Sequence, residues 1–171
     1  MIPTQQLGAG SYIVRVTASG TDTIQPYRLE LAIVDNGPVS TAVPVGTGCG
    51  GLTWNALTTP KIGNTLVQTL TGITNPAGSI GLVLLGATEI PGGLDLAAFG
   101  APGCRTYLQA DDIVVQFPLI GTTMIYTLLI PNNPQLVGST LMTQGALLVP
   151  PGTNALGGLT GNATRLTFGT Q

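Results

Sequence analysis

Charged residues are scarce in this chain. They make up 7% of its 171 residues, against about 25% in an average soluble protein. The segments 62–88 and 113–164 contain none at all. The five basic residues are scattered and cannot neutralise a phosphate backbone, so the composition excludes nucleic-acid binding. A surface with so few charges also repels its own copies weakly, which favours association between them.

Histidine is absent. The chain therefore lacks the usual general base and the commonest metal ligand. Among its carboxylates, Asp111 and Asp112 are the one adjacent pair. In a turn they would supply two oxygens to calcium, or simply form a solvated turn before a strand. On a strand they would point to opposite faces and form no acid–base pair. We therefore expect no enzymatic activity, no catalytic residues and no cofactor except, at most, calcium.

Long apolar runs are also missing. The longest, "IGLVLLGA", is far shorter than the roughly 20 residues that span a bilayer, so we expect no membrane span. The start, "MIPTQQLGAG", has neither the basic region nor the apolar region of a secretion signal. An exported protein with this sequence would thus be a mature piece of a longer chain.

Glycine and proline, by contrast, are abundant, with 25 and 13 copies, and they interrupt the chain too often for long helices. Runs rich in β-branched and aromatic residues lie between them and predict strands. They are "SYIVRVT", "YRLELAIV", "NTLVQTL", "IGLVLLG", "DIVVQFPL", "TTMIYTLLI", "TLMTQGALLV" and "TRLTFG". We therefore predict an all-β fold, an antiparallel β-sandwich or jelly roll of about eight to ten strands.

The pattern also predicts a division of the chain. Residues 1–34 hold two strands and a long turn, which we interpret as a β-hairpin. Residues 35–47, "DNGPVSTAVPVGT", have turn residues and no clear period, which indicates a linker. Residues 48–171 would form the sandwich. A lone hairpin buries too little surface to be stable in water. It must therefore lie on the main domain, pair with another chain, or belong to a larger protein.

Three glycines, Gly46, Gly48 and Gly51, have the G-x-G-x-x-G spacing of a dinucleotide-binding loop. Such a loop needs a helix after it and an acidic residue about 20 positions on. "LTWNALTTP" follows instead, and the first acidic residue after the motif is Glu89. We interpret these glycines as providing positive φ angles around Cys49.

Cys49 and Cys104 each lie in a glycine-rich turn. A disulfide between them would stabilise the fold by about 4 kcal/mol in the chain-entropy model. It would also indicate an oxidising compartment. The alternative is two unrelated buried thiols. Among the aromatic residues, Trp54 and Tyr107 are candidates for an exposed platform that binds sugars. The other interpretation is that Trp54 packs beside the disulfide.

Two stretches resemble known bacterial families. "LGAGSYIVRVTASGTDTIQPYRLELAIV" resembles the closing strands of the bacterial pre-peptidase C-terminal domain. From residue 46 onward the chain resembles a β-rich module at the C-termini of large secreted proteins of aquatic bacteria, through "GTGC", "PKIGNTL", "GLVLLGAT", "GAPGC", "VGSTLMTQGALL" and "RLTFG". The second resemblance implies export, a disulfide and a non-catalytic accessory role.

The sequence thus predicts an extracellular or cell-surface structural module. Its expected partners are copies of itself, joined by β-strand addition into a filament or surface assembly, with residues 11–34 as the added strands. One alternative is a module that binds carbohydrate or mediates adhesion, with a polysaccharide as partner. Another is a fragment of a secreted enzyme.

Overall fold

The fold was analysed in a computed structural model, which describes residues 37–110, 112–119 and 121–171. These residues contain strands and two short 3₁₀ turns but no α-helix, so the predicted all-β class is confirmed. The jelly-roll arrangement stays a prediction. The strands are β1 (Thr41–Val45), β2 (Thr53–Ala56), β3 (Thr65–Thr71), β4 (Ile80–Gly86), β5 (Thr88–Asp95), β6 (Arg105–Gln109), β7 (Asp112–Pro118), β8 (Met124–Leu129), β9 (Thr140–Leu148) and β10 (Gly158–Thr167). The 3₁₀ turns are η1 (Ala97–Phe99) and η2 (Pro134–Leu136).

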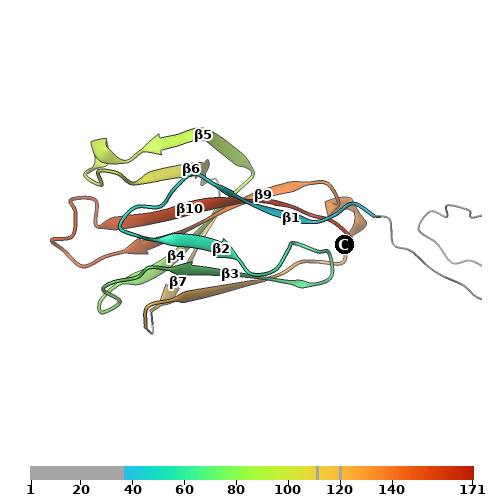
Figure 1. The fold of residues 1–171 in the computed structure, drawn as a ribbon, viewed down its shortest axis with the longest axis horizontal. Coiled ribbons are helices and arrows are strands. Elements are labelled where there is room, and N and C mark those ends of the chain that lie inside the picture. Colours follow the sequence, from blue (N-terminus) through green and yellow to red (C-terminus); the bar gives the residue numbers. More distant parts are fainter. Residues whose placement is uncertain (1–36, 111, 120) are drawn as a thin grey trace, which may run out of the picture. The chain divides into compact units, whose positions relative to one another are not determined.

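The strands form three antiparallel sheets, all within the unit that spans Val34–Gln171. The largest has the strand order β1-β10-β9-β4-β7, the second β2-β3-β8, and the third is the pair β5-β6. Figure 1 shows β5 and β6 above the long strands β9 and β10, and β2 and β3 below them. The five-stranded sheet is therefore the central layer.

Side chains of the central strand β9 are buried on both faces of the sheet. Thr143 contacts Trp54 of β2, while the neighbouring Gln144 contacts Tyr107 of β6. Because successive side chains of a strand point to opposite faces, β9 packs against both outer layers. Two core clusters result. The cluster between the central sheet and β2-β3-β8 contains Leu52, Trp54, Leu70, Ile73, Val83, Met124, Tyr126 and Leu147. The cluster under β6 contains Tyr107, Leu108, Met142 and Ala163.

Trp54 is the largest side chain of the first cluster and is fully buried. Its indole fits against the central sheet because the facing residue there is Gly145. A Cβ atom added to Gly145 would lie 2.5 Å from Trp54 Cε3, closer than two carbon atoms can approach. The ring of Tyr126 lies beside the indole, with centroids 6.4 Å apart. Trp54 therefore fits at this position because residue 145 has no side chain.

The later part of the predicted linker differs from the structure. Thr41–Val45 form β1, which pairs along its whole length with β10, whereas the sequence predicts a linker over residues 35–47. The sequence pattern does not predict this strand because it contains Pro44. Proline lacks a backbone N–H donor and is unfavourable within a sheet. An edge strand tolerates it, and β1 is an edge strand. Residues 1–36, which include the predicted hairpin, lie outside the described residues.

The other predicted strands mostly agree with the structure. The pattern locates β3, β4, β7, β8 and β9 to within two residues, and the end of β10. It misses β2, β5 and β6. Glu89 and Asp95 lie in β5, on either side of the segment "IPGG", whose proline and glycines are typical of a turn. The pairing of β5 with β6 is interrupted between Glu89 and Leu94, so these glycines belong to a bulge within the strand rather than to a turn between strands.

Candidate interaction surface

The two cysteines form a disulfide with an S–S distance of 2.00 Å, as the sequence predicts. Cys49 lies in the connection between β1 and β2, and Cys104 directly precedes β6. Cys49 is also hydrogen-bonded to the central sheet, because its N–H donates to the carbonyl of Thr160 at 2.8 Å. The disulfide therefore ties the β5-β6 layer to the β1–β2 connection. Its role in the described unit is structural.

The glycine motif holds this connection in place and forms no phosphate loop. Gly46 and Gly51 have φ angles of 70° and 80°, which confirms the predicted positive φ at two of the three motif glycines, and Gly50 also has a positive φ of 60°. At Gly48 the prediction is wrong: this glycine has no positive φ, and a Cβ atom there would instead lie 2.0 Å from the carbonyl oxygen of Leu52. A Cβ atom on Gly46 would also lie about 2.0 Å from the ring of Tyr107. The connection can approach Tyr107 only because no side chain intervenes.

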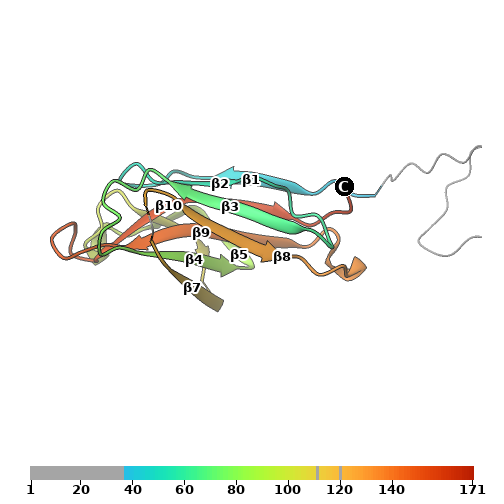
Figure 2. The ribbon, with the colours of Figure 1, turned by 90° about the horizontal axis from the view of Figure 1, so that it is seen from below.

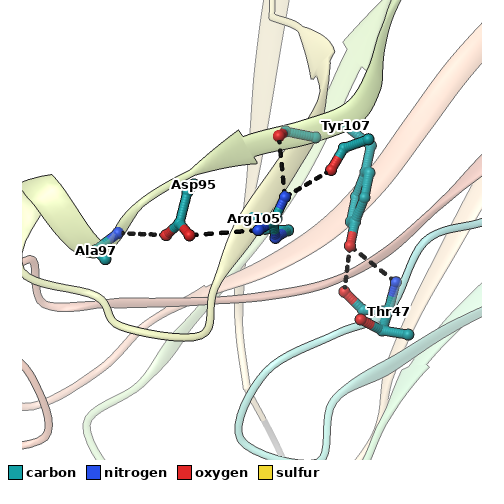
Figure 3. A network of polar contacts seen from close by, with 7 residues as sticks. Thr47, Asp95, Ala97, Arg105 and Tyr107 are labelled. Atoms are coloured by element: carbon teal, nitrogen blue, oxygen red, sulfur yellow. Dashed lines mark hydrogen bonds and ion pairs between the residues drawn. The ribbon is translucent and has the colours of Figure 1, made fainter.

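Trp54 and Tyr107 do not form a sugar-binding platform. Trp54 is 0% exposed and Tyr107 is 4% exposed. They also lie on opposite sides of the central sheet, in different core clusters. The Tyr107 hydroxyl is occupied by the backbone of Thr47: it donates to the carbonyl at 3.1 Å and accepts from the N–H at 2.9 Å (Figure 3). Trp54 packs in the cluster between the sheets rather than in the one around the disulfide, which contains Cys49, Ala101 and Cys104.

Two buried amide side chains connect the central sheet to the outer layers. Asn162 of β10 accepts from the Trp54 N–H at 2.7 Å and donates to the Trp54 carbonyl at 2.9 Å. Gln144 of β9 accepts from the Tyr107 N–H at 3.0 Å and donates to the Arg105 carbonyl at 2.8 Å. Each amide thus binds a backbone N–H and a backbone carbonyl that a neighbouring strand would otherwise bind. The sequence gives no sign of this role, because single polar residues in a strand pattern are usually exposed.

Charged side chains gather on the β5-β6 side of the described unit. Arg165 pairs with Glu89, with Nε 2.9 Å from Oε2. Arg105 pairs with Asp95 at 3.4 Å and also donates to the Gly92 carbonyl at 2.8 Å (Figure 3). The remaining described charged side chain, Lys61, lies in the β2–β3 connection. Exposed pairs of this kind contribute about 0–1 kcal/mol each, so they affect solubility more than stability.

The outer face of the β2-β3-β8 sheet carries no charge. Its residues alternate along each strand with those that point into the core, and all are at least partly exposed except Thr69, which is 7% exposed. They are Thr53 and Asn55 of β2, Thr65, Val67, Thr69 and Thr71 of β3, and Ile125, Thr127 and Leu129 of β8. Ile125 and Leu129 are 62% and 72% exposed. Figure 2 shows this sheet with β8 at its margin. Threonines and exposed aliphatic side chains thus share one surface.

Two hollows in the described part of the chain differ in size and depth. One cavity has a volume of about 40 Å³ and is lined by residues that include Leu52, Ile73, Leu147 and Leu159. The other, of about 540 Å³, is open to solvent rather than enclosed, and its lining includes Ile80 and Leu119. Small-molecule pockets are typically about 300–1,000 Å³. The described residues hold no group of three or more potential metal ligands. Asp111 and the side chain of Asp112, the calcium candidates, lie outside them.

Comparison with known proteins yields no relative: no family model, no curated protein and no solved structure matches this chain. Within the described residues, no helix is long and apolar enough to cross a bilayer.

Proposed function

We propose that this protein is a non-enzymatic, extracellular structural module that associates with copies of itself by β-strand addition, giving a filament or a surface assembly. The observation that carries the proposal is the outer face of the β2-β3-β8 sheet. It combines exposed aliphatic side chains with an absence of charge, and β8 lies at its edge. Proteins that remain monomeric usually protect such edges with charges or proline.

The distribution of charge supports the same proposal. Four of the described charged side chains are engaged in the two ion pairs of the β5-β6 side, namely Glu89, Asp95, Arg105 and Arg165. Charge of either sign is therefore missing from β8, the edge strand to which another copy would add. Association along that edge would desolvate threonine hydroxyls and aliphatic carbons of β8, which costs far less than desolvating ions.

An extracellular location is supported by the disulfide. Disulfides persist in oxidising compartments and are rare in reducing ones. The bridge joins the β5-β6 layer to the β1–β2 connection of the described unit. It would therefore help the fold to survive outside a cell, where no chaperone can refold it.

Sedimentation velocity on the full chain over a wide range of concentrations, combined with negative-stain microscopy, tests the proposal. We expect the average mass to rise with concentration. Because the contact lacks charge, the assembly should persist between about 0.05 M and about 1 M salt, where screening abolishes assemblies held by exposed ions. A single monomeric species at the highest concentration would contradict the proposal.

A further inference from the structure

The free edge of β8 is defined by the hydrogen bonds of β3. Ile130, directly after β8, directs both its backbone groups to the β3 side: its N–H donates to the Asn64 carbonyl at 2.9 Å, and its carbonyl accepts from the Gly63 N–H at 3.0 Å. Backbone groups in an antiparallel pair alternate in direction from one residue to the next. The backbone groups of Ile125, Thr127 and Leu129 therefore point away from β3, along the free edge.

Every other described strand with an outer edge is protected there. At the outer edge of β2, the side chain of Asn162 binds backbone groups that another strand would need, and Gln144 does the same for β6. The sequences of the remaining strands contain features that discourage pairing, since β1 includes Pro44, β5 includes Pro91 and a bulge, and β7 begins with Asp112, ends with Pro118 and has an irregular register. β8 has no proline, no charge and an unbroken register with β3. No described residue pairs with its free edge.

We propose that β8 pairs with β8 of a second copy, antiparallel and centred on Thr127, so that two three-stranded sheets become one continuous six-stranded sheet. This inference rests on the proposed function and names the contact through which copies meet. The arrangement is a two-fold one, in which the same surface serves on both copies. Further contacts, for which residues 11–34 are the candidates, would extend the pair into a filament.

The sequence of β8 is complementary to itself in this register. Ile125 lies opposite the partner's Leu129, and Thr127 lies opposite the partner's Thr127. Each aliphatic side chain exposed at the edge thereby gains an aliphatic neighbour on the outer face, and the two threonines can exchange a hydrogen bond. One pairing therefore gives hydrogen-bond partners to the free backbone groups of the edge and covers its exposed aliphatic side chains. The predicted strand 27–34 matches the edge less well, because its sequence carries the charged residues Arg28 and Glu30, which would be placed against the uncharged edge of β8.

Cysteine cross-linking tests the register. Directly opposed residues in a hydrogen-bonded antiparallel pair have Cα atoms about 5.5 Å apart, within the roughly 4.4–6.8 Å that a disulfide spans. On oxidation, Thr127→Cys should therefore form a covalent dimer alone. Ile125→Cys and Leu129→Cys should cross-link when mixed, but neither should cross-link with itself. Like positions would lie about 14 Å apart, since they are displaced by four residues. Thr53→Cys, on the same face at the closed β2 edge, is the matched control and should remain monomeric on a non-reducing gel.

A charge at the edge tests whether the contact drives assembly. Thr127→Lys should weaken the dimer at least tenfold in sedimentation velocity, whereas the exposed control Thr53→Lys should not. Both side chains are exposed, so near-ultraviolet circular dichroism should show that both variants fold.

The outcomes separate the two proposals. If the wild-type chain never associates, the proposed function fails. If it associates while Thr127→Lys has no effect and the mixed cysteines do not cross-link, only the β8 pairing fails. If Thr127→Lys blocks association but the mixed cysteines stay unlinked, another strand, such as residues 27–34, occupies the edge, and the β8 pairing is again overturned.

Discussion

Replacement of Asn162 by alanine should destabilise the fold more than any exposed change in the neighbouring strand. Asn162 is 6% exposed, and its amide satisfies both backbone groups of Trp54, at 2.7 and 2.9 Å. Alanine would leave an N–H and a carbonyl buried without these partners. Each such group costs about 1–3 kcal/mol, so we expect a loss of about 2–6 kcal/mol. That is a large part of the roughly 5–15 kcal/mol by which domains are stable.

Urea unfolding is a suitable assay, because Trp54 is the one tryptophan in the chain and lies at the substituted site. Its fluorescence reports the local environment, and circular dichroism reports the sheets. With a slope of about 1–3 kcal/mol per M, a loss of about 2–6 kcal/mol should lower the midpoint by at least about 0.7 M. Asn55→Ala, the same change on the exposed face of β2, should shift stability by less than about 0.5 kcal/mol. Equal effects of the two substitutions would refute the assigned role of Asn162.

Asn162→Asp provides a pH-dependent version of the same test. An ionised carboxylate keeps the acceptor for the Trp54 N–H but places negative charge against the Trp54 carbonyl. A protonated carboxyl has both an acceptor and a donor, as the amide does. Burial therefore raises the pKa of this aspartate above its usual value of about 3.9. Its favourable contribution is fully present below the unfolded pKa and is lost as pH rises through the folded pKa. As the pH falls from about 7 to about 4, the free energy of unfolding of the variant should therefore rise, and the difference in stability between the variant and the wild type should become smaller.

Three further predictions concern other parts of the described unit. Gly145→Ala should cost about 1–3 kcal/mol in urea unfolding, because its Cβ would lie 2.5 Å from Trp54. A Cβ at Gly158 would meet nothing closer than 3.5 Å, so Gly158→Ala should change stability by no more than about 0.5 kcal/mol. Reduction of the disulfide should lower the free energy of unfolding by about 4 kcal/mol, measured in titrations with and without a thiol reductant. Burial raises the pKa of Tyr126 above 10.0, so the stability that its neutral phenol contributes is fully present below pH 10.0 and declines as pH rises through the raised value. Tyr126→Phe should flatten that alkaline decline in unfolding titrations.

The strands that the sequence predicts well are those with uninterrupted apolar or alternating runs. β4 and β9 are examples, since both belong to the central sheet and are covered on their two faces. β1 and β5 escape prediction because each contains a proline, and β5 also contains two glycines. Proline and glycine indicate turns by local rules. At an edge strand or a bulge, tertiary pairing makes the same residues acceptable.

The polar contacts between layers could not be predicted for a different reason. Asn162 and Gln144 act across sheets, on backbone groups far away in the sequence. Their partners depend on strand order and register, and the bulge between Thr160 and Ala163 determines the direction of Asn162. A single sequence contains no signal for that register. The disulfide was accessible to prediction because two cysteines allow only one pairing.

The location of the exposed aliphatic side chains on the three-stranded sheet has a physical consequence for its edge. Were their role to stabilise the sheet alone, they would be most effective in the middle strand β3, where neighbours on both sides cover them. The outer face of β3 instead contains three threonines and one valine, and the largest aliphatic residues, Ile125 and Leu129, lie on the edge strand β8. An edge strand shields such side chains on one side only, which leaves them 62% and 72% exposed. Apolar area on that strand is removed from water only if another strand lies beyond it.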